Sequence, residues 1–257
     1  MPTRLRQLPR SAFTLIELVV VVAVLVILAG LILPKLDLFK LKANKAVAAS
    51  NIAGVTRFVE GYRIQKDLYP DGWDSLLDSL NPTQLYAKLD PQLLGPVAQA
   101  GAPTKLVLTT IASDDELRSI VRVGISSVHD HDASAPVPSD SAAATPLRAL
   151  AVGSSVATIN AADPDGQGIL NLFYPRTGAV PAGRKLFVFG LGPANDIVGT
   201  ELHDAPFYSN GNQLTNYARF LCVFEVSSTG HRAQMLGTLA ADGDPLHDEL
   251  SDYYSLD

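Results

Sequence analysis

The chain has 257 residues, with 20 basic and 26 acidic side chains, a formal charge of −6 and 47% hydrophobic residues. This length allows one large or two small domains, and the negative charge argues against a nucleic-acid binder that neutralises phosphates through its bulk surface. The single cysteine, Cys222, excludes an intramolecular disulfide, and its place in an apolar run predicts a small core residue rather than a catalytic thiol.

A basic leader precedes a membrane-length apolar run. Residues 1–12 contain three arginines and no acid, and residues 13–34 read FTLIELVVVVAVLVILAGLILP. A helix rises about 1.5 Å per residue, so about 20 such residues cross a hydrocarbon core of about 30 Å. Glu17 is the one charged residue in this run. A carboxylate costs on the order of 2.5–3.5 kcal/mol at the bilayer centre and less near an edge, so we expect Glu17 to have a cationic partner outside its own helix.

This segment resembles the N-terminal signature of the type IV pilin and type II secretion pseudopilin family. In that family a prepilin peptidase cuts just before the Phe of an FTLIE sequence and methylates the new amino terminus. The resemblance implies cleavage between Ala12 and Phe13 and N-methylation of Phe13. It also implies pairing of Glu17 with the Phe13 amine of an adjacent copy, and a helix kink at Pro34. The family has Gly before the cut, whereas this chain has Ala12. The resemblance covers residues 5–62.

Two other interpretations of the apolar run remain open. A cleaved signal peptide would have an apolar core of about 7–15 residues before a small-residue cleavage site, and this run is longer and holds a carboxylate. An uncleaved single-span anchor fits the length but leaves Glu17 unexplained. Arginines precede the run and lysines follow it, so charge leaves the orientation undecided. The resemblance implies a leader that stays inside and a domain that is exported.

The helical pattern continues beyond the apolar run. Residues at steps of four, three, four and three form one apolar stripe: Ala48, Ile52, Val55, Val59 and Tyr62. We therefore predict one helix over residues 13–64, membrane-spanning to about residue 33 and amphipathic afterwards. Pro34 lacks the backbone N–H and would kink or locally open this helix.

Residues 65–257 are predicted to form an exported globular α+β domain. A turn at residues 69–72 leads to Trp73, the only tryptophan and a predicted core anchor. The sequence Ser-Asp-Asp-Glu at 113–116 predicts a capping box and a helix that ends near Gly124. Residues 133–146, ASAPVPSDSAAATP, predict a flexible loop that divides the domain.

The C-terminal part predicts antiparallel strands. Residues 185–190 form a short apolar strand, residues 217–226 alternate, and residues 231–239 return after a turn. The alternating positions predicted to share one face are Ala218, Phe220, Cys222, Phe224 and Val226, and on the returning strand Ala233, Met235 and Leu239. A sheet with one apolar face needs a cover, which the amphipathic half of the long helix offers. The predicted fold class is therefore α+β and pilin-like: a long N-terminal helix, with a hydrophobic first half, packed on a C-terminal antiparallel β-sheet domain.

The segment that begins at Asp163 is the best metal candidate. An EF-type loop alternates oxygen ligands along its first nine positions, with Gly at the sixth. The side-chain ligands at these offsets would be Asp163, Asp165, Gln167 and Asn171. The last position, which should be a bidentate acid, is Tyr174, so calcium would be held weakly, and an ordinary Asp/Gly turn is the competing interpretation. The acidic turn at 242–248 is a second candidate of the same kind.

The remaining motifs in the sequence do not indicate an enzyme. The sequence His-Asp-His-Asp at 129–132 contains zinc-ligand types, but it lacks a second cluster at a recognisable spacing, so a solvated loop is the favoured interpretation. The sequence contains no nucleophile elbow, P-loop, HExxH or paired CxxC motif. The sequence therefore predicts no catalytic residues.

The leading hypothesis is a structural subunit of a type IV pilus-like filament or type II secretion pseudopilus. Its predicted partners are the prepilin peptidase, other pilin or pseudopilin subunits and the inner membrane, with no nucleic acid. It would cross the inner membrane once, with its globular domain in the periplasm or in a cell-surface filament. The alternative is an unprocessed, single-pass membrane-anchored ligand-binding or enzymatic domain, and the mature amino terminus separates the two.

Overall fold

The computed structural model describes residues 14–94, 104–132, 147–208 and 215–255. The chain divides into two compact units, Met1–Ala43 and Asn44–Asp257. The predicted leader at 1–12, the residue Phe13 and the predicted flexible loop at 133–146 lie outside the described residues.

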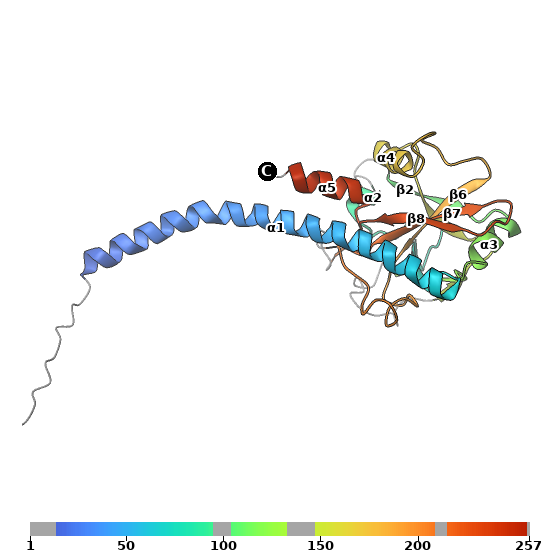
Figure 1. Cartoon of the computed structure of the whole chain (residues 1–257), viewed down its shortest axis with the longest axis horizontal. Helices are drawn as coiled ribbons and strands as arrows, with labels where there is room; N and C mark the ends of the chain where they lie inside the picture. Colours follow the sequence, from blue (N-terminus) through green and yellow to red (C-terminus); the bar gives the residue numbers. More distant parts are fainter. Residues whose placement is uncertain (1–13, 95–103, 133–146, 209–214, 256–257) are drawn as a thin grey trace, which may run out of the picture. The chain divides into compact units, whose positions relative to one another are not determined.

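The first element is one uninterrupted helix, α1 (Leu15–Lys66), of 52 residues (Figure 1). Its bounds lie within two residues of the predicted helix. It begins behind Thr14 and ends before Asp67, whose φ of 58° lies in the left-handed region. The helix continues through Pro34, so this proline does not end it, and the kink predicted there stays a prediction.

The second unit holds an eight-stranded sheet with short helices between the strands. The elements after α1 are β1 (Trp73–Asp78), α2 (Pro91–Leu94), β2 (Leu106–Thr110), α3 (Asp114–Val121), β3 (Ser127–His131), β4 (Leu147–Ala149), β5 (Ser155–Ile159), α4 (Pro164–Phe173), β6 (Arg184–Gly190), β7 (Leu221–Ser227), β8 (Gln234–Leu239) and α5 (Leu246–Ser255). Strand β6 is central and pairs with β1, β5 and β7. Every strand pair in the described sheet is antiparallel except β1 with β3. The predicted α+β class, with a long helix and an antiparallel-rich sheet, is confirmed. The parallel pair of β1 and β3 was not predicted from the sequence.

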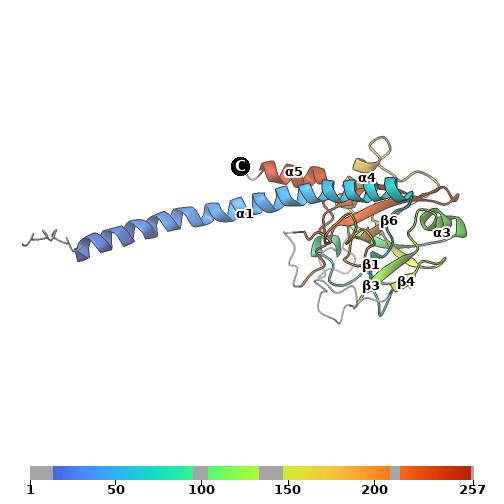
Figure 2. The same cartoon turned by 60° about the horizontal axis from the view of Figure 1, so that its bottom comes forward.

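The amphipathic half of α1 covers one face of this sheet, as Figure 2 shows. Its stripe residues Ala48, Ile52, Val55 and Val59 are at most 3% exposed. They share a core with the alternating residues of β7 and the residue before it: Phe220, Cys222, Phe224 and Val226. The predicted stripe is confirmed, and the predicted strand face is confirmed from Phe220 to Val226, although the strand begins at Leu221 and Ala218 precedes it.

The opposite face of the sheet is buried too. Leu221 and Val223 of β7 and Leu186 of β6 pack with Ile169 and Leu170 of α4 in a second core. Strands β6 and β7 therefore carry apolar side chains on both faces. This agrees with the continuously apolar strand predicted over residues 185–190, whereas β7 was predicted to have one apolar face.

One predicted face assignment is wrong. Ala233 and Met235 pack in the core under α1, but Leu239 packs in the second core. The pairing of β7 with β8 shifts between Val223 and Phe224, which leaves Leu236 as an extra residue. Such a β-bulge reverses the alternation beyond it, so Leu239 changes sides.

Helix α3 begins with the predicted cap. The Ser113 hydroxyl accepts a hydrogen bond from the Glu116 N–H at 3.2 Å, and the Glu116 carboxylate accepts one from the Ala112 N–H at 2.7 Å. The helix ends three residues before Gly124, whose φ of 101° suits glycine. Both predicted ends of this helix are confirmed.

Candidate functional site

The start of α1 contains a capping box between Thr14 and Glu17. The Glu17 carboxylate accepts hydrogen bonds from the Thr14 N–H and the Thr14 hydroxyl, each at 2.8 Å, and the Thr14 hydroxyl accepts one from the Glu17 N–H at 3.3 Å. Reciprocal bonds of this kind satisfy N–H groups that a helix start leaves without intrahelical partners. The spacing Thr14-x-x-Glu17 is the sequence signal for this cap, which the prediction of an intersubunit role for Glu17 did not include.

The cap leaves Glu17 able to bind a cation. Both bonds from Thr14 go to one carboxylate oxygen, Oε2, and a carboxylate offers about four acceptor sites. Between Glu17 and Lys35 the helix contains no basic residue. A nearby cation for Glu17 would therefore have to come from the residues before the helix or from outside the chain.

None of the described residues covers the first half of α1. Every side chain described between Leu15 and Leu33 is exposed. By length and composition α1 is the one helix among the described residues that can cross a membrane. A helix that is apolar on all sides requires lipid or other helices around it.

The predicted calcium ligands do not form an ion-binding loop. The Asp163 carboxylate caps α4 and accepts hydrogen bonds from the N–H groups of Asp165 and Gly166 at 3.0 and 2.9 Å. Pro164 lies in the first turn of the helix. Gln167 and Asn171, on the following turns, bond to each other at 3.1 Å.

The loop geometry predicted for Asp163, Asp165, Gln167 and Asn171 is therefore wrong. An Asp followed by Pro is also the pattern of a helix start, because Asp accepts from the first N–H groups and Pro needs no acceptor there. In this segment the helix-start pattern therefore determines the structure, and the alternating oxygen ligands do not form a loop. Calcium binding stays a prediction of the sequence alone, and the structure offers no ligand set for it at this segment.

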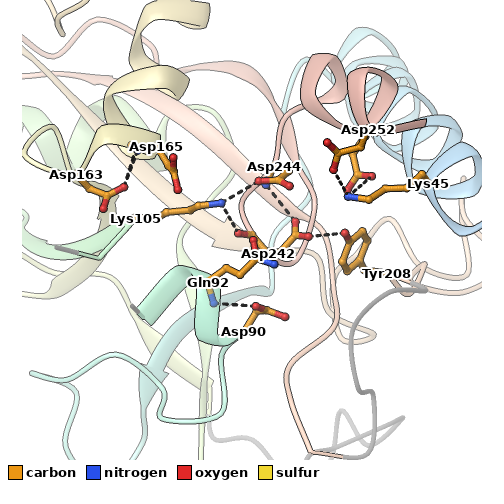
Figure 3. Close-up of polar contacts among 12 residues, drawn as sticks. Lys45, Asp90, Gln92, Lys105, Asp163, Asp165, Tyr208, Asp242, Asp244 and Asp252 are labelled. Atoms are coloured by element: carbon orange, nitrogen blue, oxygen red, sulfur yellow. Dashed lines mark hydrogen bonds and ion pairs between the residues drawn. The ribbon is translucent and has the colours of Figure 1, made fainter. Parts of the chain in front are cut away.

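The acidic turn between β8 and α5 faces two lysines (Figure 3). Asp242, Asp244 and Glu249 place carboxylate oxygens within 4.8 Å of one another. The Lys105 ammonium donates hydrogen bonds to Asp244 Oδ1 at 2.8 Å and to the Asp242 carbonyl at 3.1 Å. The Tyr208 hydroxyl donates to the Asp242 carboxylate.

The second lysine joins α1 to α5. Lys45 Nζ lies 3.2 Å from Glu249 and 2.8 Å from Asp252. The Glu249 side chain is fully buried and that of Lys45 is 14% exposed. Burial raises the pKa of Glu249, and burial likewise raises the pKa of Asp242. Lys45 pairs with Glu249 and Lys105 pairs with Asp244, so two of the three carboxylates already have a cation. The group is therefore a poor fit for a metal ion and anchors α5.

The acidic segment at the start of α4 and the acidic turn before α5 are far apart in the sequence but line one pocket. Its volume is about 300 Å³, and its lining includes Lys105, Asp165, Asp244 and Asp248. Lys105 lies between the start of α4 and the turn before α5 (Figure 3). The sequence does not predict that these two segments lie together, because their proximity depends on the pairing of strands far apart in the chain.

The histidine motif lies in strand β3 instead of a solvated loop. Asp130 is 4% exposed and accepts two hydrogen bonds from Arg148, at 2.6 and 3.0 Å. His131 is 3% exposed, with Nε2 3.6 Å from the Asp74 carboxylate, which accepts a hydrogen bond from the Tyr217 hydroxyl. The motif therefore supplies polar contacts in the core, and the loop interpretation is wrong.

Comparison with known proteins identifies the N-terminal segment. Residues 9–33 match the family model described as the prokaryotic N-terminal methylation motif. The chain is similar to the type II secretion system core protein G of Aeromonas hydrophila, with 36% identity over 72 residues, 27% of this chain and 50% of the relative. It is also similar to the type IV wide pilus major component PilA4 of Thermus thermophilus, with 34% identity over 67 residues, 26% of this chain and 51% of the relative.

The chain spans about half the length of the curated relatives that it matches. No solved structure matches it. The predicted resemblance is confirmed for the N-terminal segment, which carries a prepilin-type methylation motif and is similar to a pseudopilin and a pilin.

Proposed function

We propose that this chain is a structural subunit of a type IV pilus-like filament or a type II secretion pseudopilus. The observation that carries the proposal is the first half of α1, a membrane-length helix whose described side chains from Leu15 to Leu33 are all exposed. A prepilin-type methylation motif covers the same segment. The similar proteins are named as a core protein of a secretion system and as a major pilus component.

Processing would supply a cation for Glu17. Cleavage by a prepilin peptidase between Ala12 and Phe13 would remove three arginines, change the formal charge from −6 to −9, and create a new amine at Phe13. Before assembly the chain would cross the inner membrane once, with the globular unit exported. The acidic surface supports no role for nucleic acid in this proposal.

Pairing between copies would set the axial register. The capping box holds the Glu17 carboxylate at the start of the helix, where the Phe13 amine of a neighbouring copy would bind it. A neighbour shifted along the helix axis would leave a carboxylate and an amine unpaired among apolar side chains. Unpaired charges of this kind are strongly unfavourable in a low-dielectric environment, so shifted neighbours would be rejected.

The mature amino terminus tests the proposal. Intact-mass measurement on the chain purified from membranes is expected to give a species that starts at methylated Phe13. A chain that retains its three leader arginines would contradict the proposal and support an unprocessed, membrane-anchored ligand-binding or enzymatic domain. Ala12→Gly, which introduces the residue usual before the cut, is the matched control for a peptidase that acts slowly on Ala12.

A further inference from the structure

The sheet is narrow where β1 meets β6. Strand β6 pairs with β7 from Arg184 to Gly190, but it pairs with β1 at one pair of residues, Asp74 and Gly190. We call this place the seam. Strands β1, β3 and β4 form one group that meets β6 through this short pairing. Side-chain contacts at the seam therefore contribute strongly to holding that group against the rest of the sheet.

Four polar side chains meet at the seam: Asp74 of β1, Tyr86, His131 of β3 and Tyr217 before β7. Each is at most 4% exposed. The Tyr217 hydroxyl donates a hydrogen bond to Asp74 Oδ2 at 2.7 Å, and His131 Nε2 lies 3.6 Å from the same oxygen. The His131 ring contacts both tyrosine rings, with its centroid 5.0 Å from that of Tyr86 and 5.2 Å from that of Tyr217.

Two glycines make room for these polar groups. A Cβ atom at Gly190 would overlap the Tyr217 hydroxyl, and one at Gly192 would overlap the Asp74 carboxylate. Neither glycine has a φ in the left-handed region, so the backbone conformation alone does not require glycine at these positions. The close approach of the side chains does. The chain is therefore built to hold a polar cluster inside the sheet.

A neutral His131 ring leaves this cluster incompletely bonded. Neither nitrogen of His131 has a hydrogen-bond partner among the described residues, and the buried Tyr86 hydroxyl has none there either. Buried polar groups without partners are unfavourable. Both nitrogens of a protonated ring donate, and a small movement would bring Nε2 to Asp74 at about 2.7–2.9 Å, the length of a charge-assisted hydrogen bond. Tyrosine rings also attract a cation.

The charged groups near the seam are mainly acidic: Asp74 and Asp78 of β1, Asp132 after β3, and Arg219 beside Tyr217. Burial, and then the charges of Asp132 and Asp78, raise the pKa of Tyr86 to about 12. Three acids and one base thus surround the His131 ring. Asp130 and its partner Arg148 lie on the other face of β3, because successive residues of a strand point to opposite sides.

We propose that His131 is a proton-binding site that closes the seam in acid. Protonated His131 pairs with Asp74 and ties β1 and β3 to the segment before β7. At higher pH the ring is neutral, the pair is lost, and β1 separates from β6 more readily. Histidine ordinarily changes charge between about pH 5 and 8. Since the closed seam binds the proton, its stability is greatest at low pH and falls as the pH rises. The inference goes beyond the proposed function and does not depend on it.

Hydrogen exchange of the full-length chain in detergent tests the proposal. Exchange rates measured at about pH 5.5 and about pH 8 are corrected for the intrinsic effect of pH on exchange. In the wild type, protection of peptides from β1 and β3 is expected to be about tenfold higher at the lower pH, whereas protection of β6 and β7 changes little.

Three variants separate proton binding from packing. His131→Gln keeps a polar side chain that does not titrate, and Asp74→Asn keeps an acceptor for the Tyr217 hydroxyl without the charge. Both are expected to remove the pH dependence of protection in β1 and β3. His129→Gln is the matched control, because His129 lies on the same face of β3 two residues earlier. This control is expected to keep the pH dependence.

The wild-type measurement is decisive even if a variant fails to fold. Equal protection of β1 and β3 at the two pH values would overturn the inference. A pH dependence that persists in His131→Gln or Asp74→Asn, or that disappears in His129→Gln, would also overturn it. A fall of equal size in β6 and β7 would mean that the whole domain responds rather than the seam. Polymer yield is measured separately, so these outcomes leave the proposed function intact.

Discussion

The Glu17 carboxylate accepts two hydrogen bonds from Thr14, at 2.8 Å each, and so caps the same helix that it is proposed to join to other copies. The cap holds the carboxylate within the first turn, next to the point where cleavage would create an amine. One acidic residue therefore serves the local structure of the subunit and the proposed contact between subunits.

Variants of Glu17 separate these two roles. Glu17→Gln keeps an oxygen that can accept from Thr14 but loses the charge, whereas Glu17→Ala loses both. We expect both variants to insert into the membrane normally and to yield little polymer, because neither can neutralise the Phe13 amine of a neighbour. Membrane fractionation and the yield of sheared filaments measure the two effects. Wild-type polymer from Glu17→Ala would rule out the pairing role.

Thr14 provides the matched comparison. Thr14→Val removes the hydroxyl and keeps the Glu17 charge, and loss of a capping side chain typically costs about 0.5–2 kcal/mol of helix stability. Polymer yield is expected to fall much less than in Glu17→Gln. An equal fall in the two variants would mean that the cap, rather than the charge, is what assembly requires.

Removal of Lys45 should destabilise the globular unit. Lys45→Met leaves the fully buried Glu249 without its cation, and breaking a buried pair by removing one partner costs about 3–5 kcal/mol. Denaturant unfolding of the full-length chain measures this loss. The double variant Lys45→Met/Glu249→Gln should recover part of it, because the unpaired charge is gone. The exposed pair of Arg232 and Asp67 is the control, and Arg232→Met should change stability by about 0–1 kcal/mol.

The buried acids give stability a defined pH dependence. Burial raises the pKa of Asp242 from its model-compound value of 3.8, so between that value and the raised pKa the folded state binds more protons than the unfolded state. Stability from this group is therefore greatest below the unfolded value and falls as the pH rises through the window. Unfolding free energies measured across the acidic range should show this fall in the wild type and a smaller one in Asp242→Asn. Identical profiles for the two proteins would contradict it.

Calcium should not change the stability of the domain. Lys45 and Lys105 already pair with Glu249 and Asp244, the Tyr208 hydroxyl donates to Asp242, and Asp163 caps a helix. Thermal melts with excess Ca²⁺ and with a chelator are expected to give the same Tm. Asp163→Ala should lower stability by about 0.5–2 kcal/mol in both conditions, as loss of a cap does. A Tm that rises with Ca²⁺ would show that a metal site exists.

Periodicity predicts the parts of the fold that follow a regular repeat. The stripe from Ala48 to Val59 and the alternation from Phe220 to Val226 both face the core as predicted, because a regular helix or strand fixes which residues share a face. Leu239 breaks the rule, since a single extra residue in β8 reverses the alternation. Gly237, a glycine inside the strand, is the local sign of this irregularity, and the prediction did not use it.

The candidate site is predictable where its signals are local. The motif around Phe13 and Glu17 and the caps at Thr14 and Asp163 are each encoded within five residues of sequence. At Asp163 two local patterns compete, and the helix start prevails over the ion-binding loop. The contact of Lys45 with α5 depends on the tertiary fold and has no local signal.

The amphipathic part of α1 has consequences for the order in which the chain is made and exported. This segment is made before the rest of the domain, yet its apolar stripe is covered by β7 and its Lys45 is paired by α5, elements separated from it by most of the domain. A nascent chain interrupted before residue 221 would therefore present a bare amphipathic helix. Surfaces of this kind attract chaperones and proteases and aggregate readily. Truncated translocation products should accordingly be cleared, so that full-length subunits alone accumulate.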